Sequence, residues 1–164
     1  SAGAFTSTKR HDWLQNASLR GDFNLKPLLL TFIVHGAAND SNQNSYDASR
    51  TKYVSNFYSY NEIGAGPILN IELPNRFLLF ISTDWSRRFY VGRLTQDVNG
   101  NYGDSKISQT TWLSMLTLRY PISEHFSAKA SFSYLTASSN MAYEAYYRYN
   151  YSASTYAFGM EWRL

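Results

Sequence analysis

Large apolar residues alternate with small or charged residues along the last nine positions of the chain, Tyr156 to Leu164. A β-strand places successive side chains on opposite faces, so this run has one apolar face and one small or charged face. Ala157, Gly159, Glu161 and Arg163 lie on the second face. The apolar face consists of Tyr156, Phe158, Met160, Trp162 and Leu164.

The same two-residue period recurs in earlier segments, and no segment has the 3.6-residue period of an amphipathic helix. We therefore predict an all-β fold in a single domain, residues 1–164. The predicted strands lie in residues 13–24, 28–38, 53–73, 77–91, 107–120, 126–134 and 156–164.

The connections between these strands alternate between short and long. Short turns are predicted at residues 24–27, 74–75 and 121–125, where Pro27, Pro74 and Pro121 favour a turn. Long polar loops are predicted at residues 39–52, 92–106 and 138–150. Because each strand of a meander reverses direction, all the short turns fall at one end of the sheet and all the long loops at the other.

This organisation resembles the β-barrels of the bacterial outer membrane. Those barrels have short periplasmic turns, longer external loops and strands that alternate between apolar and polar positions. The run YAFGMEWRL resembles their C-terminal strand, which the barrel assembly machinery is thought to recognise, although this chain ends in Leu164 and the family usually ends in Phe. The resemblance implies an antiparallel up-and-down transmembrane β-barrel in the bacterial outer membrane. Its partners would be membrane lipid, lipopolysaccharide and the assembly machinery.

The period alone does not decide which face points inward, because a soluble ligand-binding barrel buries its apolar face. The alternations run over about 9–11 residues, which is enough to cross a bilayer when the strand is tilted, and this favours the membrane barrel. The charge on the opposite face also favours the membrane barrel, because that face is too charged to line an apolar ligand cavity. Aromatic side chains near the strand ends suit two interfacial belts. These aromatic residues are Trp13, Phe23, Phe77, Trp85, Phe89, Trp112, Tyr120, Phe126 and Trp162.

The number of strands leaves two architectures open. With the C-terminus on the periplasmic side, residues 13–24 run inward, and a complete barrel needs one more outward strand. Residues 2–9 are a short candidate for it, giving eight strands. Otherwise the chain is the C-terminal part of a larger or split barrel that pairs with other segments or subunits.

Composition narrows the function classes. The chain has 164 residues, no cysteine and a net charge of +3. The absence of cysteine excludes disulfides, cysteine-based zinc sites and thiol catalysis. The basic residues are scattered and form no stripe that would follow a phosphate backbone, so nucleic acid is not an expected partner. The N-terminal residues SAGAF contain no signal peptide, so an exported protein would be a mature or trimmed form.

Charged residues of both signs occupy the polar face of the predicted strands. In a narrow barrel such charges pair into a polar plug, and in a wider barrel they line a channel. The predicted interior residues are Arg20, Asp22, His35, Glu62, Glu72, Asp84, Arg88, Arg119, Lys129, Glu161 and Arg163.

We expect a structural or surface-interaction barrel that presents long external loops. One alternative is a component of a pore or export channel, and another is a lipid-modifying enzyme. For an enzyme, His35 with Asp84 is the candidate pair, but no serine is placed beside it by the sequence, so no catalytic residue is assigned.

Two loop motifs have a more ordinary explanation. The segment 97–104 resembles the start of a calcium-binding loop, but Tyr102 replaces the expected Gly and Ser108 the expected Glu, which favours a hairpin turn. No metal or cofactor is therefore expected. Tyrosines cluster in the last loop and suit either an interfacial belt or a binding surface. They are Tyr143, Tyr146, Tyr147, Tyr149 and Tyr151.

Overall fold

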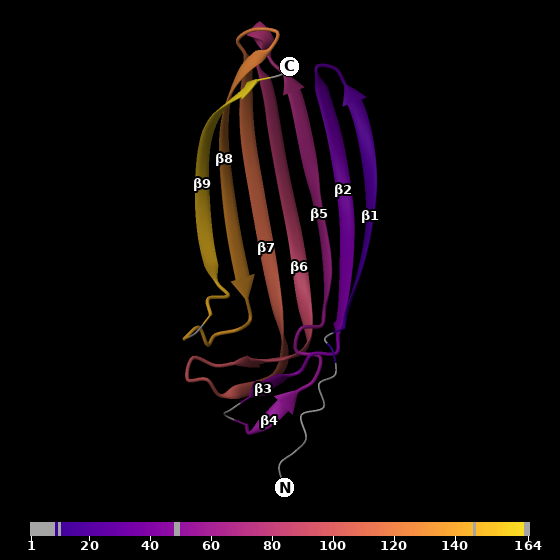
Figure 1. The fold of residues 1–164 in the computed structure, drawn as a ribbon, viewed down its shortest axis with the longest axis vertical. Helices are drawn as coiled ribbons and strands as arrows, with labels where there is room; N and C mark the ends of the chain where they lie inside the picture. Colours follow the sequence, from indigo (N-terminus) through magenta and orange to yellow (C-terminus); the bar gives the residue numbers. More distant parts are fainter. Residues whose placement is uncertain (1–8, 10, 48–49, 146, 163–164) are drawn as a thin grey trace.

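A computed structural model describes residues 9, 11–47, 50–145 and 147–162. Seven strands form one antiparallel meander (Figure 1). They are β1 (Asp12–Leu25), β2 (Leu28–Ser41), β5 (Tyr60–Glu72), β6 (Leu78–Gln96), β7 (Tyr102–Pro121), β8 (Phe126–Ser139) and β9 (Tyr151–Trp162). Two short strands, β3 (Ser45–Asp47) and β4 (Lys52–Val54), pair in a separate hairpin. The 3-10 turn η1 (Pro74–Arg76) is the single helical element within the described ranges.

The predicted all-β fold and its antiparallel order are confirmed. β1 and β9 are the two edges of the main sheet, and no described strand pairs with the outer side of either one. The sheet is therefore open over the described residues. The candidate eighth strand, residues 2–9, falls almost wholly outside them.

Two of the three predicted long loops lie at one end of the sheet and the short turns lie at the other, but the third predicted long loop is only a short turn, residues 97–101. Figure 1 shows the short turns, at residues 26–27, 73–77 and 122–125, together at the upper end of the sheet. The long connections, at residues 42–59 and 140–150, lie at the lower end, with the turn 97–101 that joins β6 to β7. We call these the short-turn end and the loop end.

Several predicted boundaries at the loop end are wrong. β8 continues to Ser139 instead of ending at residue 134, and β9 begins at Tyr151 instead of residue 156. Residues 92–106 are mostly strand, because β6 continues to Gln96 and β7 starts at Tyr102. The pairing shifts register between Phe89 and Gln96, which breaks the two-residue period and hides the strand in the sequence. Residues 39–52 include the end of β2 and the β3–β4 hairpin, and residues 55–59 lie outside any strand although 53–73 was predicted as one.

The strand register places side chains of two kinds on the two faces of the sheet. Paired residues share a face, and the row Leu19, Val34, Ala65, Trp85, Trp112 lies on the face that we call the apolar face. The row through Asp22, Thr31 and Ile68 lies on the opposite, polar face.

Glycines let β5 and β6 approach closely on the polar face. A Cβ at Gly66 would overlap the carbonyl oxygen of Thr83, and a Cβ at Gly64 would overlap the imidazole of His35. Glycine at such points permits the tight backbone approach that a strongly bent sheet requires.

The molecule exposes far more surface than a soluble protein of its size. Its accessible area is 11824 Å², whereas a soluble monomer of 18.8 kDa exposes roughly 8,300 Å² on the usual scaling with mass. The main buried cluster within the described chain is small, and it lies at the loop end, where Tyr90, Ile107 and Met141 pack together. Most large apolar side chains of the main sheet therefore remain uncovered.

Candidate functional site

The polar face carries a series of ion pairs between strands. Glu62 of β5 accepts a hydrogen bond of 2.7 Å from Nε of Arg88 on β6. The guanidinium of Arg88 also lies 4.1 Å from the ring centre of Tyr60. On β1, Arg20 donates to Asp22 at 3.0 Å, and Asp22 also accepts a hydrogen bond from Thr31 of β2. Each charge is thus held beside its opposite.

Two further pairs reach across an intervening strand. His35 of β2 lies 2.9 Å from Asp84 of β6, with its ring over Gly64 of β5. Arg119 of β7 lies 3.5 Å from Glu161 of β9, on the far side of β8. Side chains converge on the inner side of a curved sheet, so these contacts indicate that the polar face is the concave one.

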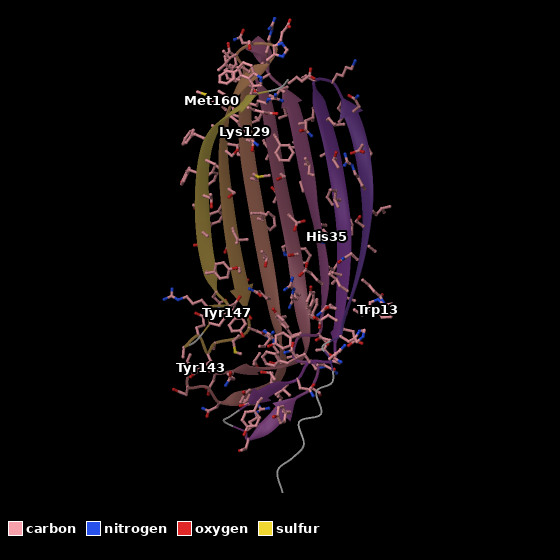
Figure 2. The ribbon with its side chains drawn as sticks, viewed as in Figure 1. Trp13, His35, Lys129, Tyr143, Tyr147 and Met160 are labelled. Carbon is pink, nitrogen blue, oxygen red and sulfur yellow. The ribbon has the colours of Figure 1, made fainter. Side chains whose placement is uncertain are left out.

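The predicted interior residues within the described chain all lie on this polar face. Glu72 and Lys129 join it through the register, and Figure 2 shows Lys129 near the short-turn end and His35 in the body of β2. Arg163 lies outside the described residues. The structure thus brings together Glu62 with Arg88, His35 with Asp84, and Arg119 with Glu161, although no two members of these pairs are close in sequence.

Sequence reasoning missed the apolar side chains that share the polar face. The register places Ile68, Phe80, Leu113, Met115 and Leu135 there, between the charged groups. Leu113 and Leu135 face each other directly across β7 and β8. The concave side is therefore mixed in character, with ion pairs around an apolar middle.

His35 has the carboxylate partner that a catalytic pair needs. Among the hydrogen bonds of the described residues, however, none joins a serine to His35, so the structure brings together only the His35–Asp84 pair. In the same part of the chain there is no group of three or more His, Asp or Glu side chains that would hold a metal ion.

The apolar face is continuous and highly exposed. Leu19 is 75% exposed, Met160 75% and Phe158 85%. The nine predicted interface aromatics all lie on this face or immediately beside it, and they include all four tryptophans. Figure 2 shows Trp13 towards the loop end of β1 and Met160 towards the short-turn end of β9.

The residues of the predicted assembly signal share this face on β9. Tyr156, Phe158, Met160 and Trp162 pair with Phe132, Ala130, Ala128 and Phe126 of β8. Leu164 lies outside the described residues. The ring of Tyr156 contacts Phe132 with centroids 5.0 Å apart, and the ring of Trp162 contacts Phe126 at 6.0 Å.

The loop end has its own side-chain organisation. Tyr143 and Tyr149 of the last loop pack against the buried cluster, whereas Tyr147 is 60% exposed and lies beside Tyr149. Burial raises the pKa of Tyr149. Tyr151 begins β9, and Tyr146 lies outside the described residues. The tyrosine cluster thus contributes largely to packing within the loops.

Two exposed carboxylates organise the turns. Asp97 accepts hydrogen bonds from the backbone of Asn99 and Asn101, and the side-chain amide of Asn101 holds the pKa of Asp97 below its usual range. Residues 97–101 are thus the predicted hairpin turn. In the last loop Glu144 accepts three hydrogen bonds from Asn150 and Tyr149, and the amide of Asn150 lowers the pKa of Glu144.

A cavity of about 620 Å³ opens among these loops. It lies between the β3–β4 hairpin, the loop-end extension of β6 and β7, and the last loop. Sequence reasoning missed it because its lining comes from three segments distant in sequence. The available signal for this cavity was the presence of aromatic residues and two arginines in segments that were predicted to be loops.

Comparisons of the chain with family models, with curated proteins and with solved structures found no match. No helix within the described residues has the length and apolar character needed to span a bilayer. The fold and the side-chain arrangement are therefore the basis for a functional proposal.

Proposed function

We propose that this chain is a transmembrane β-barrel, or a segment of one, in the bacterial outer membrane. In this proposal the apolar face contacts lipid, the polar face lines the interior, and the loop end is external. The chain presents its long loops at the cell surface for structural or interaction roles.

The observation that carries the proposal is an apolar band bounded by aromatic residues. Near the short-turn end the apolar face carries Phe23, Phe77, Tyr120, Phe126 and Trp162. The second group, Trp13, Trp85, Phe89 and Trp112, lies farther from the short-turn end, with Trp85 and Trp112 near the middle of β6 and β7. The distance from Phe77 to Trp85 is eight residues (85 − 77), or about 26 Å at 3.3 Å per residue. Tilted by roughly 40°, that path spans about 20 Å, close to the apolar band of known membrane barrels.

The composition of the band supports the same conclusion. From the short-turn group as far as Trp13, Trp85 and Trp112, the apolar face carries no charged side chain in any of the described strands. Beyond the Trp85–Trp112 pair it becomes polar, with Arg87, Thr110 and Ser108. A soluble protein has no need to confine its exposed apolar residues to a band of fixed width, whereas the hydrocarbon core of a bilayer requires such a band.

Fluorescence quenching tests this proposal directly. All four tryptophans lie on the apolar face, so the folded chain in vesicles of brominated phosphatidylcholine should lose most of its tryptophan emission. Acrylamide in the water phase should quench it weakly. A soluble barrel that buries the apolar face would give no bromolipid quenching, and the proposal would then be wrong.

The strand directions limit how the barrel closes, and the number of closing strands separates a plugged barrel from the alternative of a pore or export component. β1 and β9 are the first and seventh strands of a meander, so they run in the same direction. Closure by antiparallel pairing therefore needs an odd number of further strands. One such strand gives a narrow, eight-stranded plug, and three or more give a wider lumen. Planar-bilayer recordings separate these cases, because the wide barrel conducts in steps and the plugged barrel does not.

A further inference from the structure

We propose that the loop-end cavity is a binding site for an acidic saccharide, that is, a sugar ring bearing a carboxylate. The cavity lies outside the apolar band, so this inference does not depend on the membrane proposal. Its volume of about 620 Å³ falls within the range of roughly 300–1,000 Å³ typical of small-molecule sites.

Aromatic rings form much of the wall. Tyr46, Phe57, Tyr102, Tyr143 and Tyr149 come from three segments that are distant in sequence, and they converge on the cavity. Tyrosine and phenylalanine offer large, rigid contact area at low entropic cost. The apolar faces of a sugar ring pack on such surfaces, and the amides of Gln96 and Asn99 in the lining suit its hydroxyl groups.

Two arginines supply the charge that selects an anion. The guanidinium of Arg50 lies 3.2 Å from the ring centre of Tyr102. That of Arg93 lies 4.2 Å from the ring centre of Phe57 and 4.3 Å from that of Tyr90. Stacking fixes the plane of a guanidinium, and a fixed plane favours the two-pronged hydrogen bonding that a carboxylate accepts.

The charge balance of the lining is positive. The charged residues of the lining are Asp47, Arg50 and Arg93, two cations and one anion. Arg50 contacts Asp47 at 3.7 Å, a long ion pair, while Nε of Arg93 donates to the carbonyl of Phe57 at 2.8 Å. An incoming carboxylate would balance the remaining charge, whereas a neutral sugar would not.

Isothermal titration of the full chain, folded in detergent, tests the proposal with two sugars that differ only at C6. Galacturonic acid should bind saturably, and galactose should bind at least tenfold more weakly. Equal binding of both sugars, or no binding of galacturonic acid at about 20 mM, would overturn the proposal. Inorganic phosphate binding as tightly as galacturonic acid would overturn the saccharide assignment. If lipopolysaccharide displaces galacturonic acid, the natural ligand is a sugar of the membrane surface. If lipopolysaccharide does not displace it, the natural ligand is a free acidic sugar.

Variants place the binding in this cavity. Arg50→Gln should weaken galacturonic acid at least tenfold, and Arg50→Lys should recover only part of the loss because an ammonium has no planar fork. Arg87→Gln is the matched control, since Arg87 lies over Phe89 on the apolar face and not in the cavity. Circular dichroism verifies that each variant is folded. Unchanged binding in folded Arg50→Gln would place the site elsewhere.

Discussion

Replacing Phe158 by arginine separates a lipid-facing surface from a water-facing one. The side chain is 85% exposed on the apolar face of β9. In water, a substitution at so exposed a position changes the free energy of unfolding by about 0.5 kcal/mol or less. In a bilayer, arginine on the lipid face of a barrel costs about 2–4 kcal/mol at the midplane and 0–1 kcal/mol near the interface.

The position of Phe158 within the band sets the expected magnitude. It lies four residues (162 − 158) from Trp162, about 13 Å along the strand and about 10 Å across the bilayer at the usual tilt. That depth is close to the middle of a band about 20–25 Å thick. Phe158→Arg should therefore destabilise the protein in vesicles by about 2–4 kcal/mol.

Ser152→Arg is the matched control on the same face of the same strand. Ser152 lies ten residues (162 − 152) from Trp162, about 25 Å across the bilayer, where the cost should be about 1 kcal/mol or less. Phe158→Leu controls for loss of the ring alone. Urea titrations of the three variants in phosphatidylcholine vesicles, followed by tryptophan fluorescence, give the free energies of unfolding. Equal values for the two arginine variants would refute the lipid-facing assignment.

Three other predictions follow from particular contacts. Gly66→Ala should lower the free energy of unfolding in urea by about 1–3 kcal/mol, because the added methyl group would overlap a carbonyl oxygen of β6. Gly159→Ala is the control, since no atom lies within 4 Å of the added methyl group, and it should lower this free energy by about 0.5 kcal/mol or less. Similar losses in the two variants would contradict the tight approach of β5 and β6. The pKa of Asp97 is lowered, so its stabilisation of the turn is present above the unfolded pKa and is lost as pH falls through the lower folded value. The protection factor of the Gly100 amide, which is the exchange rate of the unfolded chain divided by that of the folded protein at the same pH, should then fall at acidic pH, and Asp97→Asn should abolish that pH dependence. The lipid A mass spectrum of an expressing bacterium should be unchanged; a mass change that disappears in His35→Ala would favour the enzyme instead.

The sheet was predictable because one repeating constraint shaped most of it. A strand with two unlike environments must alternate, and the alternation from Leu28 to Ala38 or from Phe126 to Tyr134 is directly visible. The alternation also gave the faces of Arg88, Glu62 and the other charged residues. It did not give their partners, since the approach of His35 to Asp84 depends on the register of β5 between them and on the missing Cβ of Gly64.

The loop end was not predictable for a related reason. There the chain no longer lies between an apolar and a polar surface, and its conformation depends on contacts between segments that are distant in sequence. Met141 packs with Tyr90 and Ile107, while Arg93 contacts Phe57 through both ring and carbonyl. No period marks such contacts, so a segment that is polar and irregular in sequence reads as a loop even where it is strand.

The edges of the sheet decide how the membrane proposal must be completed. β9 has twelve residues, so about six N–H and six C=O groups point away from β8. Each backbone group left without a partner in hydrocarbon costs several kcal/mol, so an edge of this length would cost tens of kcal/mol in total. Residual lipid contact with the apolar face does not offset a loss of that size. If the apolar face contacts lipid, the outer edges of β1 and β9 must both be paired, and their common direction requires an odd number of strands to do so. Protection of the β1 and β9 amides from hydrogen exchange in vesicles is therefore a necessary consequence of the proposal, and rapid exchange along either edge would contradict it.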